Sequence, residues 1–201
     1  VLGERPGPLR VVATVPVSDT AHALFAAHGL VYVADGVAGL RVLELGGDGA
    51  PRWVGGVETP AECQDVAIDG ALGGASGWRI AVQVLDLSSP RAPRIVGTVP
   101  TGDGGSGRIA LSGTRALEIN RDRLHVYDLS VPDRPVEAPG FVFSMWPVDL
   151  AAVGSSVFVS CGTHGVWHLR LPEAGPVKIV GIIPTDASAG AISAAGDSAY
   201  V

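Results

Sequence analysis

An apolar run, a proline-bounded polar turn and a second apolar run recur along this chain. The clearest copy spans residues 84–99 (VLDLSSPRAPRIVGTV), similar stretches occupy residues 42–57, 124–142 and 166–183, and residues 1–15 resemble the second half of the pattern. The proline that opens each second run recurs at spacings of 43, 42, 42 and 41 residues, at Pro8, Pro51, Pro93, Pro135 and Pro176. A fixed period of this length indicates an architecture of stacked repeat units.

Each repeat contains four short apolar runs, which we letter A to D. In the first repeat they occupy residues 9–15 (D), 22–27 (A), 30–34 (B) and 40–45 (C), and Gly-, Pro- and Asp-rich connectors separate them. No segment shows a helical period over ten or more residues. Four strands in about 42 residues are the size of one propeller blade. The sequence therefore predicts an all-β fold, a β-propeller of about five four-stranded blades.

The repeats predict a single propeller domain over residues 1–201, with units at roughly 8–50, 51–92, 93–134, 135–175 and 176–201 plus 1–7. Residues 200–201 match residues 32–33, and residues 1–2 match residues 42–43. We therefore expect either a ring whose N- and C-terminal strands share one blade or an arc truncated within a longer protein. In the second repeat, residues 71–78 (ALGGASGW) replace the usual B run, which predicts a weak or displaced strand because glycine disfavours strands.

Composition excludes several function classes. The net charge of −6 argues against a nucleic-acid partner, since affinity for phosphates depends on Lys and Arg. No apolar run approaches the roughly 18 residues of a membrane-spanning helix, so no transmembrane segment is expected. The two cysteines lie in different repeats, which predicts no disulfide framework.

Several segments resemble the LVIVD-repeat family of bacterial and archaeal β-propellers. The similarity covers nearly the whole chain and rests on residues 32–35 (YVAD), 39–43 (GLRVL), 84–90 (VLDLSSP), 93–97 (PRIVG) and 126–130 (VYDLS). The resemblance implies an extracellular or cell-surface location and offers no shared catalytic motif. It also implies that the Asp-Leu-Ser segments form turns between strands C and D.

Charged residues recur at one position of strand A. Five residues before the glycine between A and B, successive repeats place Asp65, Arg108 and Asp149, whereas the first and last repeats have Leu24 and Ala191. In a propeller, Arg108 would lie between two carboxylates at the inner mouth of the channel and could use its planar donor fork on either. This cluster is predicted to be either a polar ligand site or a structural ion network between blades.

An aromatic residue, Trp146, lies on the connector between strand D and the next strand A, with Phe143 and Met145 close by. Such residues either pack beneath their connector or form an exposed binding patch. His164 lies in the B–C loop of the fourth repeat, which a propeller places on the same face. We therefore count Asp65, Arg108, Asp149, Trp146 and His164 as candidate ligand-binding residues.

A metal site is the alternative for this face. His22 and Cys63 each lie seven residues before their glycine, and Cys161 and His164 lie in one loop, so these four residues could supply ligands. His164 and His168 cannot share a metal along one strand, because four residues of strand span about 13 Å. Residues 102–107 match GxGxxG, but a strand follows instead of the helix that the dinucleotide motif needs. No cofactor is therefore predicted.

Together these features predict a non-catalytic module that binds or scaffolds an unknown protein or small-molecule ligand on the face formed by the D–A and B–C loops. The alternative is a propeller enzyme, a metal-dependent hydrolase or a redox enzyme, with its site at the mouth of the channel. Fold alone does not decide between them, because propellers have many functions.

Overall fold

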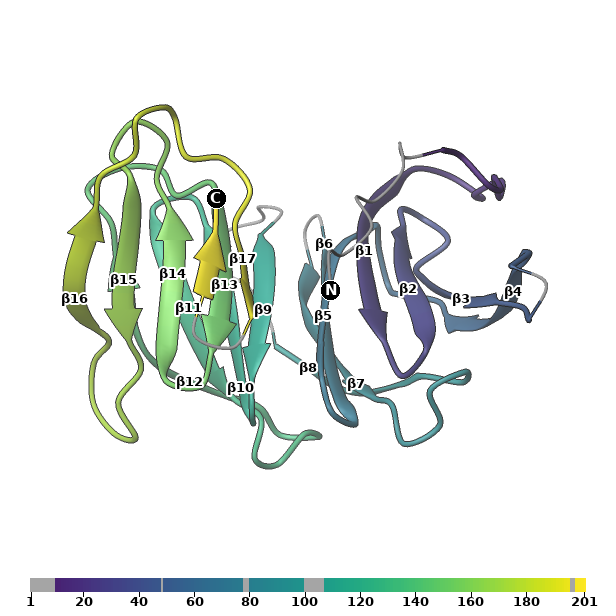
Figure 1. The fold of residues 1–201 in the computed structure, drawn as a ribbon. Coiled ribbons are helices and arrows are strands. Elements are labelled where there is room, and N and C mark those ends of the chain that lie inside the picture. Colours follow the sequence, from purple (N-terminus) through teal and green to yellow (C-terminus); the bar gives the residue numbers. More distant parts are fainter. Residues whose placement is uncertain (1–9, 48, 78–79, 100–106, 196–197) are drawn as a thin grey trace, which may run out of the picture.

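The computed structural model describes residues 10–47, 49–77, 80–99, 107–195 and 198–201, and we report the structure of these residues. They form four four-stranded antiparallel sheets and one two-stranded sheet, with no helix among them (Figure 1). Each four-stranded sheet is one blade, and consecutive strands pair within it. The predicted all-β propeller of about five blades is confirmed.

The strands follow the predicted order A, B, C, D in each blade. Blade 1 contains β1 (Ala21–Ala27), β2 (Leu30–Asp35), β3 (Leu40–Leu45) and β4 (Pro51–Val57), and blade 2 contains β5 (Cys63–Asp69), β6 (Leu72–Gly77), β7 (Ile80–Asp86) and β8 (Arg94–Thr98). Blade 3 contains β9 (Arg108–Ser112), β10 (Arg115–Asn120), β11 (Arg123–Asp128) and β12 (Val136–Val142). Blade 4 contains β13 (Asp149–Val153), β14 (Ser156–Ser160), β15 (Val166–Arg170) and β16 (Lys178–Ile183), and the fifth unit is the hairpin of β17 (Ser193–Ala195) and β18 (Ser198–Tyr200).

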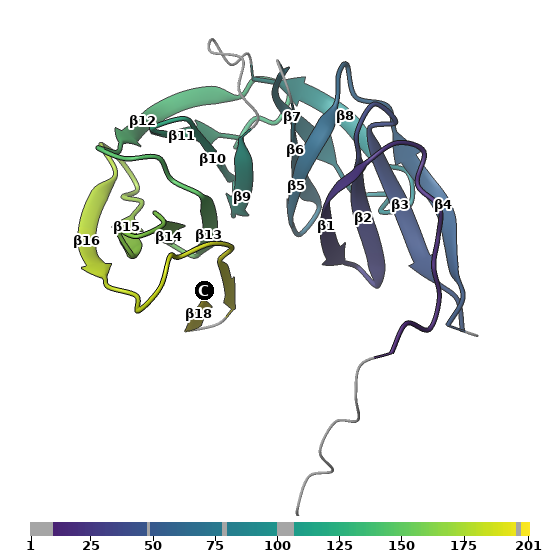
Figure 2. The same cartoon turned by 90° about the horizontal axis from the view of Figure 1, so that it is seen from above.

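The blades are arranged as an open arc (Figure 2), and the strands on its inner side line a cavity, called the central channel below. The A strands form its inner wall, where β5 contacts β1 and β9, and β13 contacts β9 and β17. The D strands β4, β8, β12 and β16 lie on the outside. The end with the D–A connectors and B–C loops, at the top of Figure 1, is called the mouth face below, and the opposite end, with the A–B and C–D turns, is called the turn face.

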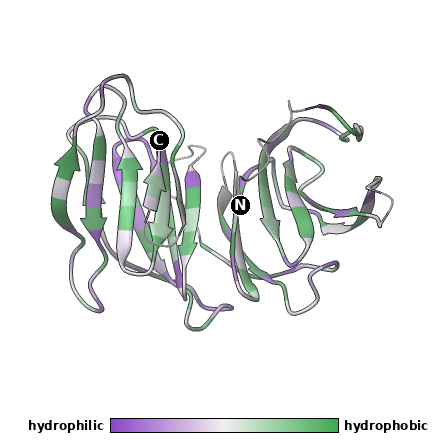
Figure 3. Cartoon of the chain, in the orientation of Figure 1, coloured by the Kyte–Doolittle hydropathy of each residue, from purple (hydrophilic) through white to green (hydrophobic). Residues whose placement is uncertain are grey.

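The core lies between the blades, because each sheet buries both of its faces. On strand A, the large residues Val66, Ile109 and Leu150 face the preceding blade, and the small residues Ala67, Ala110 and Ala151 face the following one. Ile192, just before β17, likewise faces blade 4. Alternation of side chains along a strand produces this division. Most strand positions are accordingly green or pale in Figure 3, and few are purple.

The Asp-Leu-Ser turns between strands C and D are confirmed. The Asp86 carboxylate accepts a hydrogen bond of 2.9 Å from the Ser88 N–H, and Asp128 accepts one of 2.8 Å from Ser130. In each case the aspartate side chain accepts a hydrogen bond from the backbone two residues further on, which stabilises the turn as an Asx-turn.

The repeats were aligned on the glycine between strands A and B, and this alignment is wrong in the first repeat. The turn after β1 consists of His28 and Gly29, both with positive φ (56° and 72°), so glycine is its second residue. In the next three repeats glycine is the first turn residue, as at Gly70 with φ 59°. Two-residue hairpin turns of type I′ favour glycine as the second residue, and those of type II′ favour glycine as the first. The structural equivalent of Asp65 is therefore Ala23, and Leu24 is the equivalent of Val66.

The expected displacement of strand B in the second repeat is also wrong. Strand β6 pairs with both neighbours along its length. Its glycines are buried beneath large side chains: a Cβ on Gly73 would lie 2.7 Å from Leu87, and one on Gly74 would lie 2.6 Å from Ile109. Burial against bulky neighbours thus compensates for the low strand propensity of glycine.

The predicted D strand at residues 9–15 does not form within the part of the chain that is described. Residues 10–15 belong to no strand, and Val11 and Val12 are 85% and 80% exposed. A blade shared between the N- and C-terminal strands is therefore not observed, and the blades form an arc. No helix among the described residues is long and apolar enough to cross a membrane.

Candidate functional site

The central channel is a cavity lined by several of the predicted site residues. A cavity of about 750 Å³ runs along strands β1, β5, β9 and β13, and it adjoins a second cavity of about 390 Å³ at the mouth face. Asp65, Arg108 and Asp149 line the channel, and His22 lines both cavities. The structure therefore brings together three of the five predicted ligand-binding residues.

The carboxylates of Asp65 and Asp149 each join two neighbouring blades. Asp65 accepts hydrogen bonds from the N–H of Val66 (2.9 Å) in its own strand and from the N–H of Ile109 (3.0 Å) in the next blade. Asp149 repeats the arrangement with Leu150 (3.0 Å) and Ile192 (2.9 Å). Each carboxylate thus satisfies two backbone donors that no strand pairing uses. Burial raises the pKa of Asp65, while these hydrogen bonds and the charge of Arg108 oppose the rise.

We expect the Asp65→Ala variant to lose about 2 kcal/mol of free energy of unfolding, because it leaves two partly buried N–H groups without an acceptor. Chemical denaturation measures this loss. Asp133→Ala is the control, since the Asp133 side chain is 69% exposed and its ion pair with Arg134 is long, at 3.9 Å. Equal stability of the two variants would contradict the proposed role of Asp65 in joining the blades.

Arg108 differs from these carboxylates because its side chain is half exposed. Its Nε lies 3.9 Å from an oxygen of Asp149, the outer limit of an ion pair, and its charge also lowers the pKa of Asp65. A long ion pair at an exposed position contributes little to stability. The guanidinium is therefore positioned at the channel mouth with donors available to a ligand.

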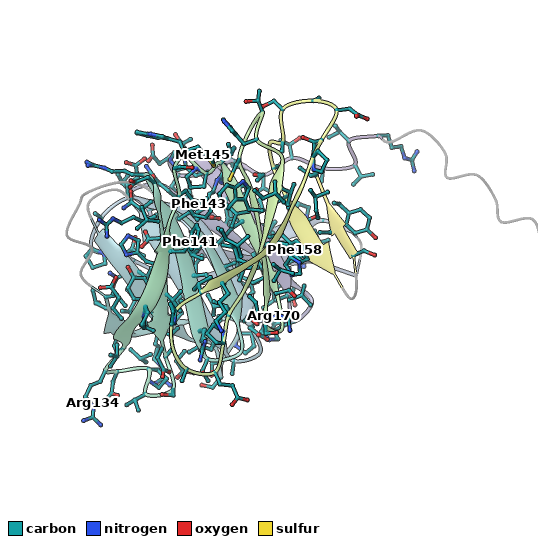
Figure 4. All side chains as sticks on the ribbon, turned by 90° about the vertical axis from the view of Figure 1, so that its left-hand side faces the viewer. Arg134, Phe141, Phe143, Met145, Phe158 and Arg170 are labelled. Atoms are coloured by element: carbon teal, nitrogen blue, oxygen red, sulfur yellow. The ribbon has the colours of Figure 1, made fainter. Side chains whose placement is uncertain are left out.

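The aromatic segment divides into a packed part and an exposed part. Phe143 is buried, and its ring centroid lies 4.9 Å from that of Phe141 and 5.7 Å from that of Trp167. Figure 4 shows Phe141, Phe143 and Met145 following one another toward the mouth face. Trp146, the next residue, is 74% exposed. Both predicted alternatives thus occur, packing for Phe143 and Met145 and exposure for Trp146.

The four residues of the predicted metal site do not converge. Cys63 is buried between blades 1 and 2, Cys161 is buried between blades 3 and 4, and both thiols are free. Burial raises the pKa of Cys63 to about 12 and that of Cys161 to about 11, which disfavours the thiolate that binds metals. His164 is exposed in its loop, and His22 lies 3.0 Å from a carboxylate oxygen of Glu62.

His22 and Cys63 were predicted to occupy the same position of strand A. This prediction is wrong, because the first repeat was misaligned at its A–B turn. Ala21 and Cys63 occupy equivalent ends of strand A, and His22 and Gln64 are the bulge residues next to them. No cluster of three His, Cys, Asp or Glu residues suitable for a metal occurs in the described ranges.

The remaining sequence motifs have structural explanations or lie outside the description. His168 contacts Ser156 (Nε2 to Oγ, 3.0 Å) and stacks on Phe158, with centroids 4.7 Å apart. Residues 102–106 of the GxGxxG match lie outside the described residues, and strand β9 follows Gly107.

Sequence analysis missed part of the mouth and a cavity on the turn face. Gln64 and Val148 line the mouth cavity, and Val148 is 47% exposed beside the charged residues. Gln64 lies in the bulge of β5 and Val148 on the connector before β13, so neither belongs to the alternating strand pattern that the sequence analysis used. The cavity on the turn face lies between blades 2 and 3, and its sequence signal is Leu72 at a position where the next repeat has Arg115.

Comparisons with known proteins identify the fold. No protein-family model and no curated protein matches this chain. A protein from Lactobacillus plantarum matches with a TM-score of 0.66 at 18% identity, covering 82% of this chain and 56% of that chain. A chain in the Mitotic Checkpoint Complex matches with a TM-score of 0.67 at 10% identity, covering 86% and 55%, respectively. The computationally designed Ika4 protein has a TM-score of 0.62 at 11% identity, covering 83% and 100%.

This chain thus spans about half the length of the first of these structures. At such low identities the similarity concerns the fold alone. The blade order, the antiparallel sheets and these structural neighbours agree that the chain folds as a β-propeller.

Proposed function

We propose that this propeller is a non-catalytic binding module that holds an acidic segment of a partner protein at its mouth face. The observation that carries the proposal is the half-exposed Arg108 guanidinium, which lines the channel mouth at 3.9 Å from its carboxylate neighbour. A guanidinium prefers carboxylate ligands, which it can bind in a bidentate manner. Exposed Val148 lines the same mouth cavity as Arg108 and offers it an apolar neighbour. Trp146, also exposed, lies two residues before Val148 on the connector that leads into β13.

The alternative of a propeller enzyme has less support. A general acid or base needs a carboxyl group that can exchange protons with a substrate. Asp65 and Asp149 instead bind backbone N–H groups of two blades. The two thiols are buried with raised pKa values, so they are poor nucleophiles.

A location in the secreted space or on the cell surface is part of the same proposal. Its support is the resemblance of the repeats to LVIVD propellers.

Selection of peptides from a phage-displayed random library tests the binding function. We expect the wild-type chain to enrich peptides that combine Asp or Glu with an apolar residue, and Arg108→Ala to lower their affinity at least tenfold. Arg134→Ala is the matched control, because this exposed arginine lies at the opposite end of its blade from Met145 (Figure 4). Enrichment without acidic residues, or equal affinity for Arg108→Ala, would reject the proposal.

A further inference from the structure

A second cavity, independent of the channel mouth, lies between blades 2 and 3 on the turn face. Its volume is about 640 Å³. The walls are largely apolar, with Leu72, Val96 and Leu129 among them, and Asp69, Asp86 and Asp133 also line it. The cavity therefore combines an apolar interior with carboxylates, which fits a long side chain that ends in a cation.

The same position between blades 3 and 4 contains such a side chain. Arg115 crosses from β10 to the C–D turn of blade 4, and its guanidinium donates hydrogen bonds to the carbonyls of Pro172 (2.6 Å) and Glu173 (2.7 Å). The cavity that remains there is only about 160 Å³. An arginine of this chain thus occupies most of this second interblade space.

Strand register establishes that the two positions are equivalent. Leu72 and Arg115 are each the first residue of strand B after the A–B turn, since Leu72 pairs with Asp69 and Arg115 with Ser112. Across the sheet, Leu72 pairs with Asp86 and Arg115 with Asp128. Leucine at position 72 therefore leaves open the space that Arg115 fills one blade further on, and it retains the equivalent carboxylate.

The carboxylates of the open cavity have contacts that a ligand can supplement. Asp86 pairs with Arg94 at 3.1 Å, but the Arg94 side chain is 71% exposed. Asp133 lies 3.9 Å from Arg134, whose side chain is 81% exposed. Asp69 accepts a hydrogen bond from the N–H of Gly113 (2.7 Å). Exposed ion pairs of this kind are weak, so an incoming cation can compete for Asp86 and Asp133.

We propose that this cavity binds an arginine side chain from a partner peptide, with its methylene groups against Leu72, Val96 and Leu129 and its guanidinium at the carboxylates. The site goes beyond the proposed binding of acidic segments at the mouth, because it lies on the opposite face and selects the opposite charge. The propeller would then have two docking faces, one for an acidic segment and one for a basic segment.

Calorimetric titration with two capped peptides tests the proposal. The probes are acetyl-Ala-Leu-Arg-Leu-Ala-amide and the same peptide with glutamine in place of arginine. We expect saturable one-to-one binding of the arginine peptide and at least tenfold weaker binding of the glutamine peptide. Equal affinity for the two peptides would overturn the proposal.

Two substitutions place the binding site. Leu72→Arg should fill the cavity as Arg115 fills its own, and it should weaken binding at least tenfold while the melting temperature is maintained. Asp86→Asn should weaken binding to a similar extent, because it removes a charge but keeps the acceptor that closes the turn. Arg108→Ala should leave this affinity unchanged, so that failure of the mouth site and failure of this site are distinguishable. Unchanged binding in both Leu72→Arg and Asp86→Asn would show that the peptide binds elsewhere.

Discussion

Gly97→Ala is expected to lower the free energy of unfolding by about 3 kcal/mol, the upper end of the usual cost of overpacking. Gly97 lies in the outer strand β8, and a Cβ at this position would overlap the carbonyl oxygen of Pro132 in the C–D turn of the next blade. A backbone carbonyl within a turn cannot rotate away as a side chain can. The variant must therefore separate blades 2 and 3 locally, and denaturant unfolding measures the cost.

The chain contains a matched control in Gly181. By register, Gly97 pairs with Val84 and Gly181 pairs with His168, so both glycines occupy the same place in an outer strand. A Cβ added to Gly181 would meet no atom of the described residues within 4 Å. We expect Gly181→Ala to change stability by no more than about 0.5 kcal/mol. Similar losses in the two variants would show that strand propensity, and not the contact with the next blade, accounts for the effect.

These glycines show what the sequence can and cannot predict. The 42-residue period predicted the blades, and the Asp-Leu-Ser segments predicted turns that Asp86 and Asp128 do form. The turn signal is local to each repeat, and the period appears when the repeats are compared with one another. The contact of Gly97 with Pro132 joins two blades, and nothing in the strand itself indicates it.

The candidate site was predictable in part, because its charged residues also follow the repeat. Asp65, Arg108 and Asp149 recur at one position of strand A, and the repeat brings them to one wall of the channel. Their division of roles was not predictable, because it depends on which backbone donors of the next blade remain unpaired. The first repeat was misaligned because a two-residue turn can place its glycine first or second.

Glu118 was not singled out by sequence, although its environment is the most unusual of any carboxyl group described here. It is fully buried in β10, its Oε2 lies 3.4 Å from the Tyr127 hydroxyl, and its Oε1 has no hydrogen-bond partner among the described residues. Burial raises its pKa from 4.5 to about 7, opposed by the charge of His125 and the hydrogen bond from Tyr127. His125 in turn bonds to Glu137 on β12.

The protonated form of Glu118 is therefore favoured in the folded chain over the unfolded one. Between pH 4.5 and about 7 the folded state binds more protons at this site, so stability decreases as pH rises through this window. Above about pH 7 the folded state must contain a buried, incompletely bonded carboxylate, at a cost on the order of 3 kcal/mol. Glutamine resembles the neutral acid at every pH.

We therefore expect Glu118→Gln to match the wild-type chain below pH 4.5 and to exceed its free energy of unfolding by about 3 kcal/mol at pH 8. Denaturant unfolding across this range measures the difference. Glu137→Gln is the control, because the Glu137 side chain is 62% exposed and its neutralisation should shift stability by less than about 1 kcal/mol. If the free energy of unfolding depended on pH in the same way for the wild type and Glu118→Gln, Glu118 would have the same pKa in the folded and unfolded chain, which would contradict the prediction. A difference that grows with pH would show that the interface between blades 2 and 3 contains a carboxyl group that weakens it at neutral pH.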